Sequence, residues 1–394
     1  MVTTEGILEA YYDCRRSKRR TASAVVYEMD YEASLVSLKD RINARTYQPG
    51  KSICFVVRWP RYREVFAAKF EDRIVHHYIA LRLNPLFEAI FSPRTFNCRK
   101  GKGQLYGINI LKEDIRQCSE NYTKDCYVMK LDLKGFFMSI DKLLLADMID
   151  RFVVDNYRGS DKEELRWLCR LVILHCPEKN CERHSPLCMW GYLDKNKSLF
   201  TNGEGRGIAI GNLFAQIFAN FLLNDLDWLL ELLGVKYHGR YVDDFYSVAR
   251  SKAFLLSLMG PIRQLLEKYH LKLNEKKFYL QHYSKGVEFT GTIVKPGRTY
   301  VCNRTINKFI MAVRRLNAIQ DESELEHDVA AINSYLGLLR QNNEYANRRK
   351  ILNMIDRRIF KEYVYIKGHY EILAIRNKHK KRTKILKKIR DGDY

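Results

Sequence analysis

Two adjacent acids, Asp243 and Asp244, lie between two runs of residues that favour extended chain, and this feature constrains the fold most. Tyr241 and Val242 precede the acids and Phe245 follows them. Aromatic and β-branched residues favour strands, whereas two successive Asp do not. The pattern predicts a strand, a tight turn and a second strand. Repelling carboxylates at such a turn suit a divalent cation, since Mg²⁺ takes carboxylates together with phosphates and water. The tetrapeptide alone is equally typical of a solvated turn.

The charge balance indicates a polyanionic partner. The 394 residues include 68 Lys and Arg against 46 Asp and Glu, which gives a formal net charge of +22. Aromatic residues make up 12% of the chain and offer stacking surfaces, so nucleic acid fits better than a membrane surface. No apolar run is long enough to span a bilayer and the N-terminus lacks a signal-peptide pattern, so we expect a cytoplasmic protein. The ten scattered Cys indicate reduced thiols.

Hydrophobic periodicity predicts the remaining elements. We expect helices over 7–45, 70–86 and 254–269 and from about 305 onward, and strands at 53–57, 61–65, 126–133, 271–278 and 287–294. A glycine-rich loop over 203–211 should lead into a long buried helix that begins near Leu213. Glycines in such a loop admit a flat base pair or a ribose close to the backbone.

Asp132 is the candidate third acid. It closes the apolar strand predicted over 126–133 and leads into a turn at Gly135. An acid at this position is expected of a metal ligand, with capping of the helix that follows as the alternative. Asp141, which stands directly before Lys142, suits the capping role.

Three other segments combine chemistry-bearing residues. The loop over 94–103 mixes cations with glycines, so its backbone and side chains could approach phosphates. Cys and His gather over 175–188, but their spacing does not match a two-Cys, two-His zinc site. We expect ordinary thiols in a surface insertion there, without zinc. The basic segment 378–390 suits RNA, a partner protein or a membrane surface equally well.

Taken in order, these features resemble the palm of reverse transcriptases. The matching segments are motif A at Leu131–Phe137, motif B at Gly207–Gln216, motif C at Tyr241–Asp244, motif D around Asn274–Phe278 and motif E around Phe289–Gly291. The resemblance implies an α+β, right-hand polymerase with fingers, an antiparallel palm and a helical thumb. We expect the N-terminal extension and fingers over 1–125, the palm over 126–295 with an insert at about 155–205, and the thumb with a basic tail over 296–394. No RNase H domain is expected.

The resemblance also implies a two-metal site. Two Mg²⁺ ions, which Mn²⁺ can replace, would be held by Asp132, the Leu133 backbone, Asp243 and Asp244. Three carboxylates on neighbouring strands can hold two ions about 4 Å apart, the spacing that phosphoryl transfer requires. Lys277 matches the motif D lysine that protonates the leaving pyrophosphate, with its neighbour Lys276 as the alternative.

Substrate contacts follow from the same motifs. Phe137 matches the aromatic position that blocks a ribose 2′-OH and so selects dNTPs, unless it is simply a core residue. The expected nucleotide-binding residues are Arg63, Arg73, Phe136, Phe137, Ile210, Gly211 and Gln216. The expected nucleic-acid contacts are Arg99, Lys100, Lys102, Tyr241, Phe289 and Gly291.

Motif B narrows the resemblance to one type of reverse transcriptase. The segment Ile210–Gln216 resembles the Ile-Gly-x-x-x-Ser-Gln signature of diversity-generating retroelement enzymes, which belong to a bacterial and phage lineage related to group II introns. The segments 98–103 and 281–286 also look like that group. Ala215 departs from it, because the family usually has Ser there, and this puts the fidelity behaviour in doubt.

The narrower resemblance implies cDNA synthesis from dNTPs on a template RNA and a primer, with frequent errors at adenines during mutagenic retrohoming. A small basic accessory protein oligomer is the implied partner. A retron-like or defence-associated reverse transcriptase is the near alternative, and a catalytically inactive RNA-binding scaffold is a more distant one. The three intact carboxylates argue against the scaffold.

Overall fold

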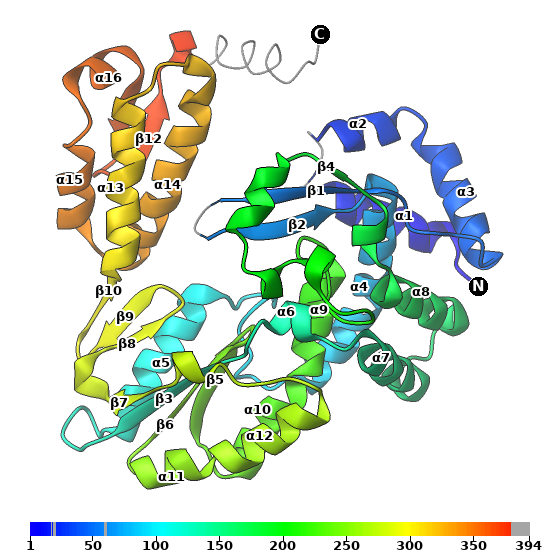
Figure 1. The fold of residues 1–394 in the computed structure, drawn as a ribbon, viewed down its shortest axis with the longest axis horizontal. Coiled ribbons are helices and arrows are strands. Elements are labelled where there is room, and N and C mark those ends of the chain that lie inside the picture. The colour runs from blue at the N-terminus through cyan, green and yellow to red at the C-terminus, as the bar shows by residue number, and fades with distance from the viewer. Residues whose placement is uncertain (17, 19–20, 59–60, 380–394) are drawn as a thin grey trace. The chain divides into compact units, whose positions relative to one another are not determined.

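The computed structural model describes residues 1–16, 18, 21–58 and 61–379 (Figure 1). The Arg- and Lys-rich segment 15–20 is described only at residues 15, 16 and 18, and the basic segment 378–390 only at 378 and 379. The chain divides into two compact units, one formed by 1–103 with 129–280 and the other by 104–128 with 281–394. The three consecutive domains expected from the sequence remain a prediction.

The regular structure of the first unit is mostly α-helical. Their bounds are α1 (Thr4–Arg16), α2 (Ala22–Glu28), α3 (Tyr31–Asn43), α4 (Phe70–Ile90), α6 (Phe136–Ser139), α7 (Lys142–Asn156), α8 (Lys162–Leu174), α9 (Leu213–Leu222), α10 (Asn224–Leu232), α11 (Lys252–Ser257) and α12 (Met259–Lys268). The Asp141 carboxylate accepts hydrogen bonds from the backbone N–H groups of Leu143 and Leu144, both at 3.1 Å, so its predicted capping of α7 is confirmed. The helix predicted over 7–45 is divided into three.

Two sheets lie among these helices. The first has the order β2-β1-β4, from β1 (Ser52–Val57), β2 (Arg63–Ala67) and β4 (Cys181–Arg183). The second has the order β5-β6-β3-β7, from β3 (Tyr127–Asp132), β5 (Tyr237–Tyr241), β6 (Asp244–Ala249) and β7 (Tyr279–His282). Strands β5 and β6 form the predicted antiparallel hairpin. Because β6 pairs with β3, the hairpin tip and the end of β3 belong to neighbouring strands of one sheet (Figure 1).

The strand predicted over 271–278 is wrong. Leu271 and Leu273 are buried and the residue between them is exposed, so the alternation that suggested a strand is real. Only Leu273 forms a bridge, to Leu133, and a 3₁₀ turn over Glu275–Lys277 follows. This segment is therefore a loop that runs along the end of β3.

The second unit holds a separate core. Its elements are α5 (Gln104–Cys118), β8 (Val287–Phe289), β9 (Thr292–Lys295), β10 (Arg298–Val301), α13 (Asn303–Asn317), α14 (Leu325–Gln341), α15 (Tyr345–Leu352), α16 (Arg357–Glu362), β11 (Val364–Lys367) and β12 (Ile372–Ile375). Apolar side chains from α13–α16 and from the β11–β12 hairpin are packed together, among them Phe309, Leu336 and Leu373.

Two sequence expectations for this second unit are corrected. The single strand expected over 287–294 is broken by positive φ angles of 49° at Thr290 and 88° at Gly291, which make a turn between β8 and β9. The region from about 305 onward is not wholly helical, because the β11–β12 hairpin ends it. The mixed α+β class itself is confirmed by these helices and sheets.

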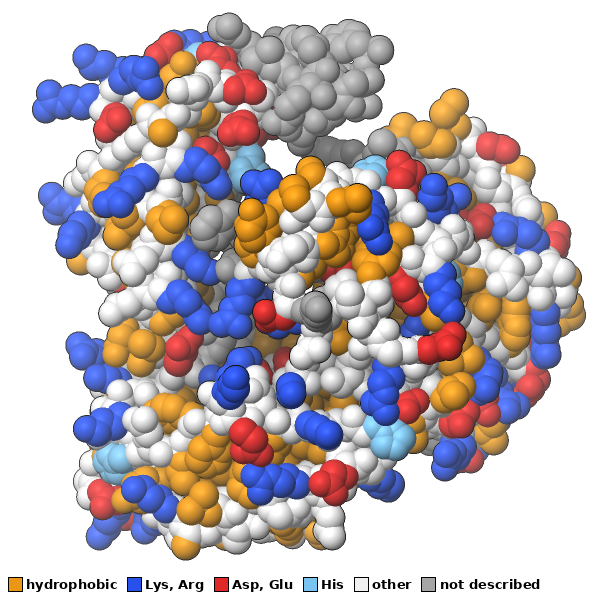
Figure 2. All heavy atoms as spheres, viewed as in Figure 1, with side chains coloured by type: hydrophobic (Ala, Val, Ile, Leu, Met, Phe, Trp, Pro, Cys, Tyr) orange, Lys and Arg blue, Asp and Glu red, His pale blue; other side chains and the backbone are white. Residues whose placement is uncertain are grey.

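Lys and Arg side chains are spread widely over the face drawn in Figure 2, with Asp and Glu scattered among them. This distribution accords with the large positive net charge. Across the described part of the chain, no helix combines the length and the apolar character that crossing a membrane demands.

Candidate active site

The β5–β6 turn carries Asp243 on a strained backbone. Tyr241 pairs with Asp244, which leaves Val242 and Asp243 as the two turn residues. Val242 has a φ of 60°, a left-handed conformation that costs a non-glycine residue about 1–3 kcal/mol. Its N–H donates to Asn97 Oδ1 at 2.9 Å, and its carbonyl accepts from Arg240 Nη1 at 3.0 Å. These two bonds fix the turn that presents Asp243.

A buried ion pair also stabilises this turn. Arg240 on β5 is completely buried, and its Nε and Nη2 atoms donate to the Asp227 carboxylate at 2.6–3.0 Å. Thr95 Oγ1 donates to the same carboxylate at 2.6 Å. A buried charge is tolerated when it is paired and fully hydrogen-bonded, so this cluster anchors β5 to α10 and to the loop before α5. Sequence reasoning missed it, because partners this far apart leave no local pattern.

Asp132, at the end of β3, is held by the loop that was expected to be a strand. Lys277 Nζ lies 2.7 Å from both carboxylate oxygens of Asp132, and Asn274 Nδ2 donates to Oδ2 at 3.1 Å. The Asn274 backbone N–H also donates to the Asp132 carbonyl at 2.8 Å. Of the two candidate lysines, Lys277 is therefore the one that reaches the acid.

A second lysine, Lys130, was not foreseen. Its Nζ lies 3.5 Å from Asp244 Oδ1. Lys130 stands two residues before Asp132 on β3, so strand periodicity places both side chains on one face of the sheet. That spacing was a usable signal in the sequence.

Burial and the charges of the neighbouring acids raise the pKa values of Asp243 and Asp244. Burial first, and then repulsion from Asp132 and Asp244, raise the pKa of Asp243 to about 6. Burial also raises the pKa of Asp244, although the nearby Lys130 ammonium acts in the opposite direction. A cation placed among these carboxylates would relieve both the desolvation and the repulsion.

This donor set fits a hard divalent ion. Among the described residues, no three His, Cys, Asp or Glu side chains are grouped closely enough to hold a metal by themselves. Mg²⁺ does not require such a cage, because it commonly binds one or two carboxylates and completes its shell with substrate phosphates and water. Asp132 and Asp243 are the carboxylates that would serve. Leu133 could contribute only its backbone carbonyl, because its hydrocarbon side chain has no ligand atom.

The two consecutive aromatic residues of motif A have different surroundings. Gly135 has a φ of 56° and turns the chain from β3 into α6. Phe136 is 3% exposed and belongs to the core, whereas Phe137 is only half-buried. The Phe137 carbonyl accepts from the Ile208 N–H at 2.9 Å, which ties motif A to motif B. Phe137 is thus the one of the pair that remains accessible to a ligand.

Motif B is packed directly against β2. The Phe66 N–H donates to the Ile210 carbonyl at 2.9 Å. Gly211 has a φ of 120°, and a Cβ there would lie 2.6 Å from the Phe66 carbonyl oxygen, so no side chain fits. Gln216 is exposed on α9, and its Oε1 accepts from the Cys98 thiol at 2.6 Å. Ala215, the departure from the family signature, is 1% exposed.

The two arginines predicted to bind the nucleotide differ in their contacts with the rest of the protein. Arg63 is exposed at the start of β2. Arg73 on α4 donates through Nε to the Ala68 carbonyl at 2.9 Å, which orients its guanidinium.

Two of the three predicted cations in the basic loop over 94–103 form hydrogen bonds or ion pairs with other residues of the protein. The Arg99 side chain is 6% exposed and forms a two-pronged ion pair with Glu88 at 2.8–3.0 Å. Lys102 Nζ donates to the Pro93 carbonyl at 2.7 Å, and burial lowers the pKa of Lys102 to about 8. Lys100 is exposed. Arg99 therefore supports the loop, and Lys100 is the better placed of the three for a phosphate contact.

The last three predicted contacts lie at turns. Tyr241 is half-buried at the end of β5, and burial raises its pKa. In the second unit, Phe289 is the last residue of β8 and is fully buried, and Gly291 lies in the turn that follows. Phe289 is thus a core residue there.

Comparison with known proteins identifies the family. Residues 60–294 match the family described as reverse transcriptase (RNA-dependent DNA polymerase). The chain is 20% identical over 292 residues to the nuclear intron maturase 1, mitochondrial, of Arabidopsis thaliana, a match that covers 57% of this chain and 40% of the maturase. A solved structure of telomerase from Candida albicans, in complex with a TWJ fragment of telomeric RNA, aligns with a TM-score of 0.47 at 12% identity and covers 79% of this chain and 58% of that one.

This chain therefore spans less than two thirds of the length of either relative. The family match covers more than half of the 394 residues and includes all three acids of the site. The chain belongs to the reverse transcriptase (RNA-dependent DNA polymerase) family.

Proposed function

We propose that this protein is an RNA-directed DNA polymerase, which makes cDNA from dNTPs on a template RNA and requires Mg²⁺. The observation that carries the proposal is the gathering of Asp132 and the Asp243–Asp244 turn on neighbouring strands, where mutual repulsion contributes to the raised pKa of Asp243. Carboxylic acids whose pKa values are raised by burial and by neighbouring charges are typical of functional sites.

Each residue of the site has a chemical task in this proposal. When bound, divalent ions would stabilise the attacking and leaving oxygens of the phosphoryl group. Asp132 and Asp243 would hold them, with Asp244 adding negative charge. Lys277 carries an ammonium at Asp132 and can give a proton to the departing pyrophosphate. Phe137 would limit the space beside the sugar of the incoming nucleotide.

The test is incorporation of dNTPs on a primed RNA template by the purified protein. Asp243→Asn keeps the shape of the side chain and removes its charge, so it should lower the Mg²⁺-dependent rate by roughly 10³-fold or more. Asp155→Asn, on the exposed surface of α7, is the matched control and should leave the rate unchanged. A wild-type protein with no incorporation, or an Asp243→Asn variant with full activity, would overturn the proposal and leave an RNA-binding scaffold as the alternative.

We further propose the diversity-generating retroelement type. Support comes from Ile210, Gly211 and Gln216 in motif B, whose loop is packed against β2 where a template–nucleotide pair would be sensed. This type implies errors at template adenines and a small basic accessory protein oligomer as partner. Both statements rest on the sequence resemblance.

Sequencing of the cDNA made on the protein's own RNA tests the subtype. Substitutions concentrated opposite adenines would support it. An even error spectrum, or cDNA from a defined non-coding RNA without such errors, would favour the retron-like or defence-associated alternative. A template-repeat and variable-repeat pair beside the gene is an independent sign of the retroelement.

A further inference from the structure

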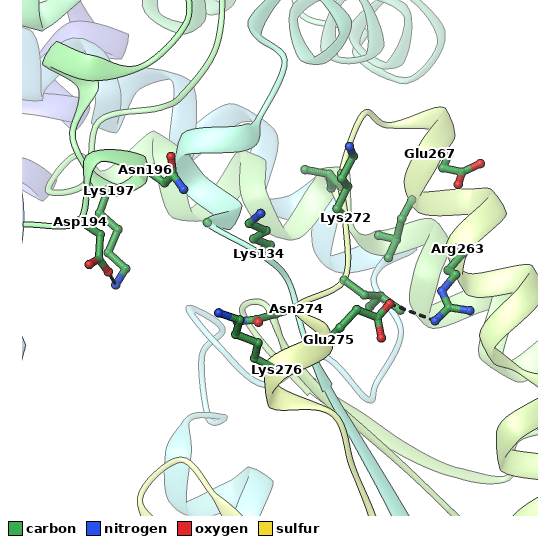
Figure 3. A pocket seen from close by; sticks show the side chains of 14 residues that line it. Lys134, Asp194, Asn196, Lys197, Arg263, Glu267, Lys272, Asn274, Glu275 and Lys276 are labelled. Atoms are coloured by element: carbon green, nitrogen blue, oxygen red, sulfur yellow. Dashed lines mark hydrogen bonds and ion pairs between the residues drawn. The ribbon is translucent and has the colours of Figure 1, made fainter.

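A pocket of about 800 Å³ lies in the first unit, next to the Asp132 loop (Figure 3). Its floor is apolar, from Leu266, Leu271 and Leu273, and its rim is charged. The volume is within the range of small-molecule sites, which is about 300–1,000 Å³. Lys134 and Gly135 of motif A and Asn274–Lys276 of motif D line it, but the space itself has no role in the function proposed above.

The charges on the rim do not balance. Lys197 pairs with Asp194, and Arg263 donates to Glu275 at 2.9 Å. Figure 3 shows three further lysines between these two pairs: Lys134, Lys272 and Lys276. All three are exposed, and no acidic side chain of the described residues forms an ion pair with any of them. Glu267 is the one other acid of the pocket lining, so the rim keeps an excess of positive charge.

The backbone holds two of these lysines close together. The Lys134 N–H donates to the Lys272 carbonyl at 2.9 Å, and Leu133 and Leu273 form the adjoining bridge. Both side chains line the same pocket, so an anion bound there could be met by both ammonium groups. Lysine is a common phosphate ligand, and it acts as a point charge.

The pocket adjoins the catalytic carboxylates. Asn274 lines it and also donates to Asp132 Oδ2 at 3.1 Å. Two neighbouring lysines of the 3₁₀ turn over Glu275–Lys277 have different surroundings. Lys277 reaches Asp132, whereas Lys276 lines the pocket. Positive charge therefore lies on both sides of this turn, at Asp132 through Lys277 and at the pocket through Lys276.

We propose that this pocket is a polyphosphate site that receives the pyrophosphate released by nucleotidyl transfer. This inference rests on the proposed polymerase function for the source of its ligand. Pyrophosphate carries several negative charges on a compact body, which matches three unpaired lysines around one space. Asp194 and Lys197, on one side of the pocket, belong to the segment 155–205 that the sequence suggested as an insert.

Calorimetric titration of inorganic pyrophosphate into the full-length protein, without metal or nucleic acid, tests the site directly. Saturable binding is expected, and the triple variant Lys134→Ala, Lys272→Ala, Lys276→Ala should bind at least tenfold more weakly. Replacing the same three residues by Arg preserves the charge and should restore binding, which separates the loss of charge from a loss of folding. The matched control is Lys124→Ala, Lys236→Ala, Lys268→Ala, which removes three exposed lysines that do not line the pocket and should bind like the wild type.

Two results would overturn the proposal. One is equal pyrophosphate affinity in the pocket variant and the control variant. The other is a loss of RNA affinity in the pocket variant that matches its loss of pyrophosphate affinity, since the lysines would then contact nucleic acid. Because pyrophosphate binding is measured without catalysis, the titration can show that the pocket binds no pyrophosphate in a protein that incorporates dNTPs. It can equally show binding in a protein that incorporates none.

Discussion

Phe136 and Phe137 show how two identical neighbours acquire different tasks. Phe136 is packed in the core and Phe137 is half-buried beside motif B. The sequence identified the aromatic pair and the family spacing pointed to Phe137, but only the fold tells which ring remains accessible.

Phe137→Ala should admit ribonucleotides. A ring that excludes a 2′-OH by contact is worth about 1–3 kcal/mol, so the dNTP preference should fall roughly 10-fold to 200-fold. The measurement is the ratio of kcat/KM for dCTP and rCTP on one RNA template. Unchanged discrimination would remove Phe137 from this role.

Phe136→Ala provides the contrast. Truncation of a buried Phe costs about 3–5 kcal/mol of stability, which urea unfolding would report. Its sugar discrimination, measured below the unfolding midpoint, should stay at the wild-type ratio.

Charged residues show the limits of sequence reasoning at this scale. Motif spacing singled out Lys277, and that lysine reaches Asp132. The same reasoning assigned Arg99 to phosphate, yet Glu88 neutralises it within the fold. A cation in a glycine-rich loop looks the same in a sequence whether or not a distant acid pairs with it.

At the scale of elements, the β5–β6 hairpin is the best predicted feature. Its residues favour strands on both sides of two acids, and the observed register follows that pattern. The loop over 271–278 was mistaken for a strand because alternate burial is shared by strands and by extended loops that lie on a core. The β11–β12 hairpin was missed because its two strands are only four residues long and follow a series of helices.

The hairpin depends on the buried pair of Arg240 and Asp227. Asp227→Ala would leave the guanidinium buried without its partner, and such a change costs about 3–5 kcal/mol. We expect a large drop in the urea midpoint together with loss of polymerase activity, because Arg240 also bonds to the Val242 carbonyl.

A double-mutant cycle isolates this pair. Asp227→Ala combined with Arg240→Ala should cost clearly less than the sum of the single changes, since neither charge is then left alone. Asp155→Ala on the surface of α7 should stay within about 0.5 kcal/mol of the wild type. Additive single changes would show that the ion pair is not coupled.

At the scale of the whole molecule, the chain carries more than one core. Residues 301–375 supply a complete apolar cluster of helices and one hairpin. Periodicity foresaw the helices of this region, but it could not foresee that α5, far earlier in the chain, belongs to the same compact unit.

A fragment of residues 298–379 should therefore unfold cooperatively in urea, as followed by circular dichroism. Leu336 is completely buried, and Leu336→Ala should lower stability by about 2–5 kcal/mol, enough to unfold a domain of this size. Met311 is 54% exposed on α13, so Met311→Ala should change stability by no more than about 0.5 kcal/mol. A fragment without a cooperative transition would show that this core needs the rest of the chain.

The left-handed Val242 has a consequence for protein engineering. Glycine tolerates this backbone conformation without the steric cost that a β-branched side chain meets. Random mutagenesis followed by selection for thermal resistance should therefore enrich Val242→Gly, while selection for cDNA yield should disfavour it, because a freer backbone holds Asp243 less firmly. Position 242 is thus where heat tolerance and catalytic output would compete in a laboratory evolution experiment.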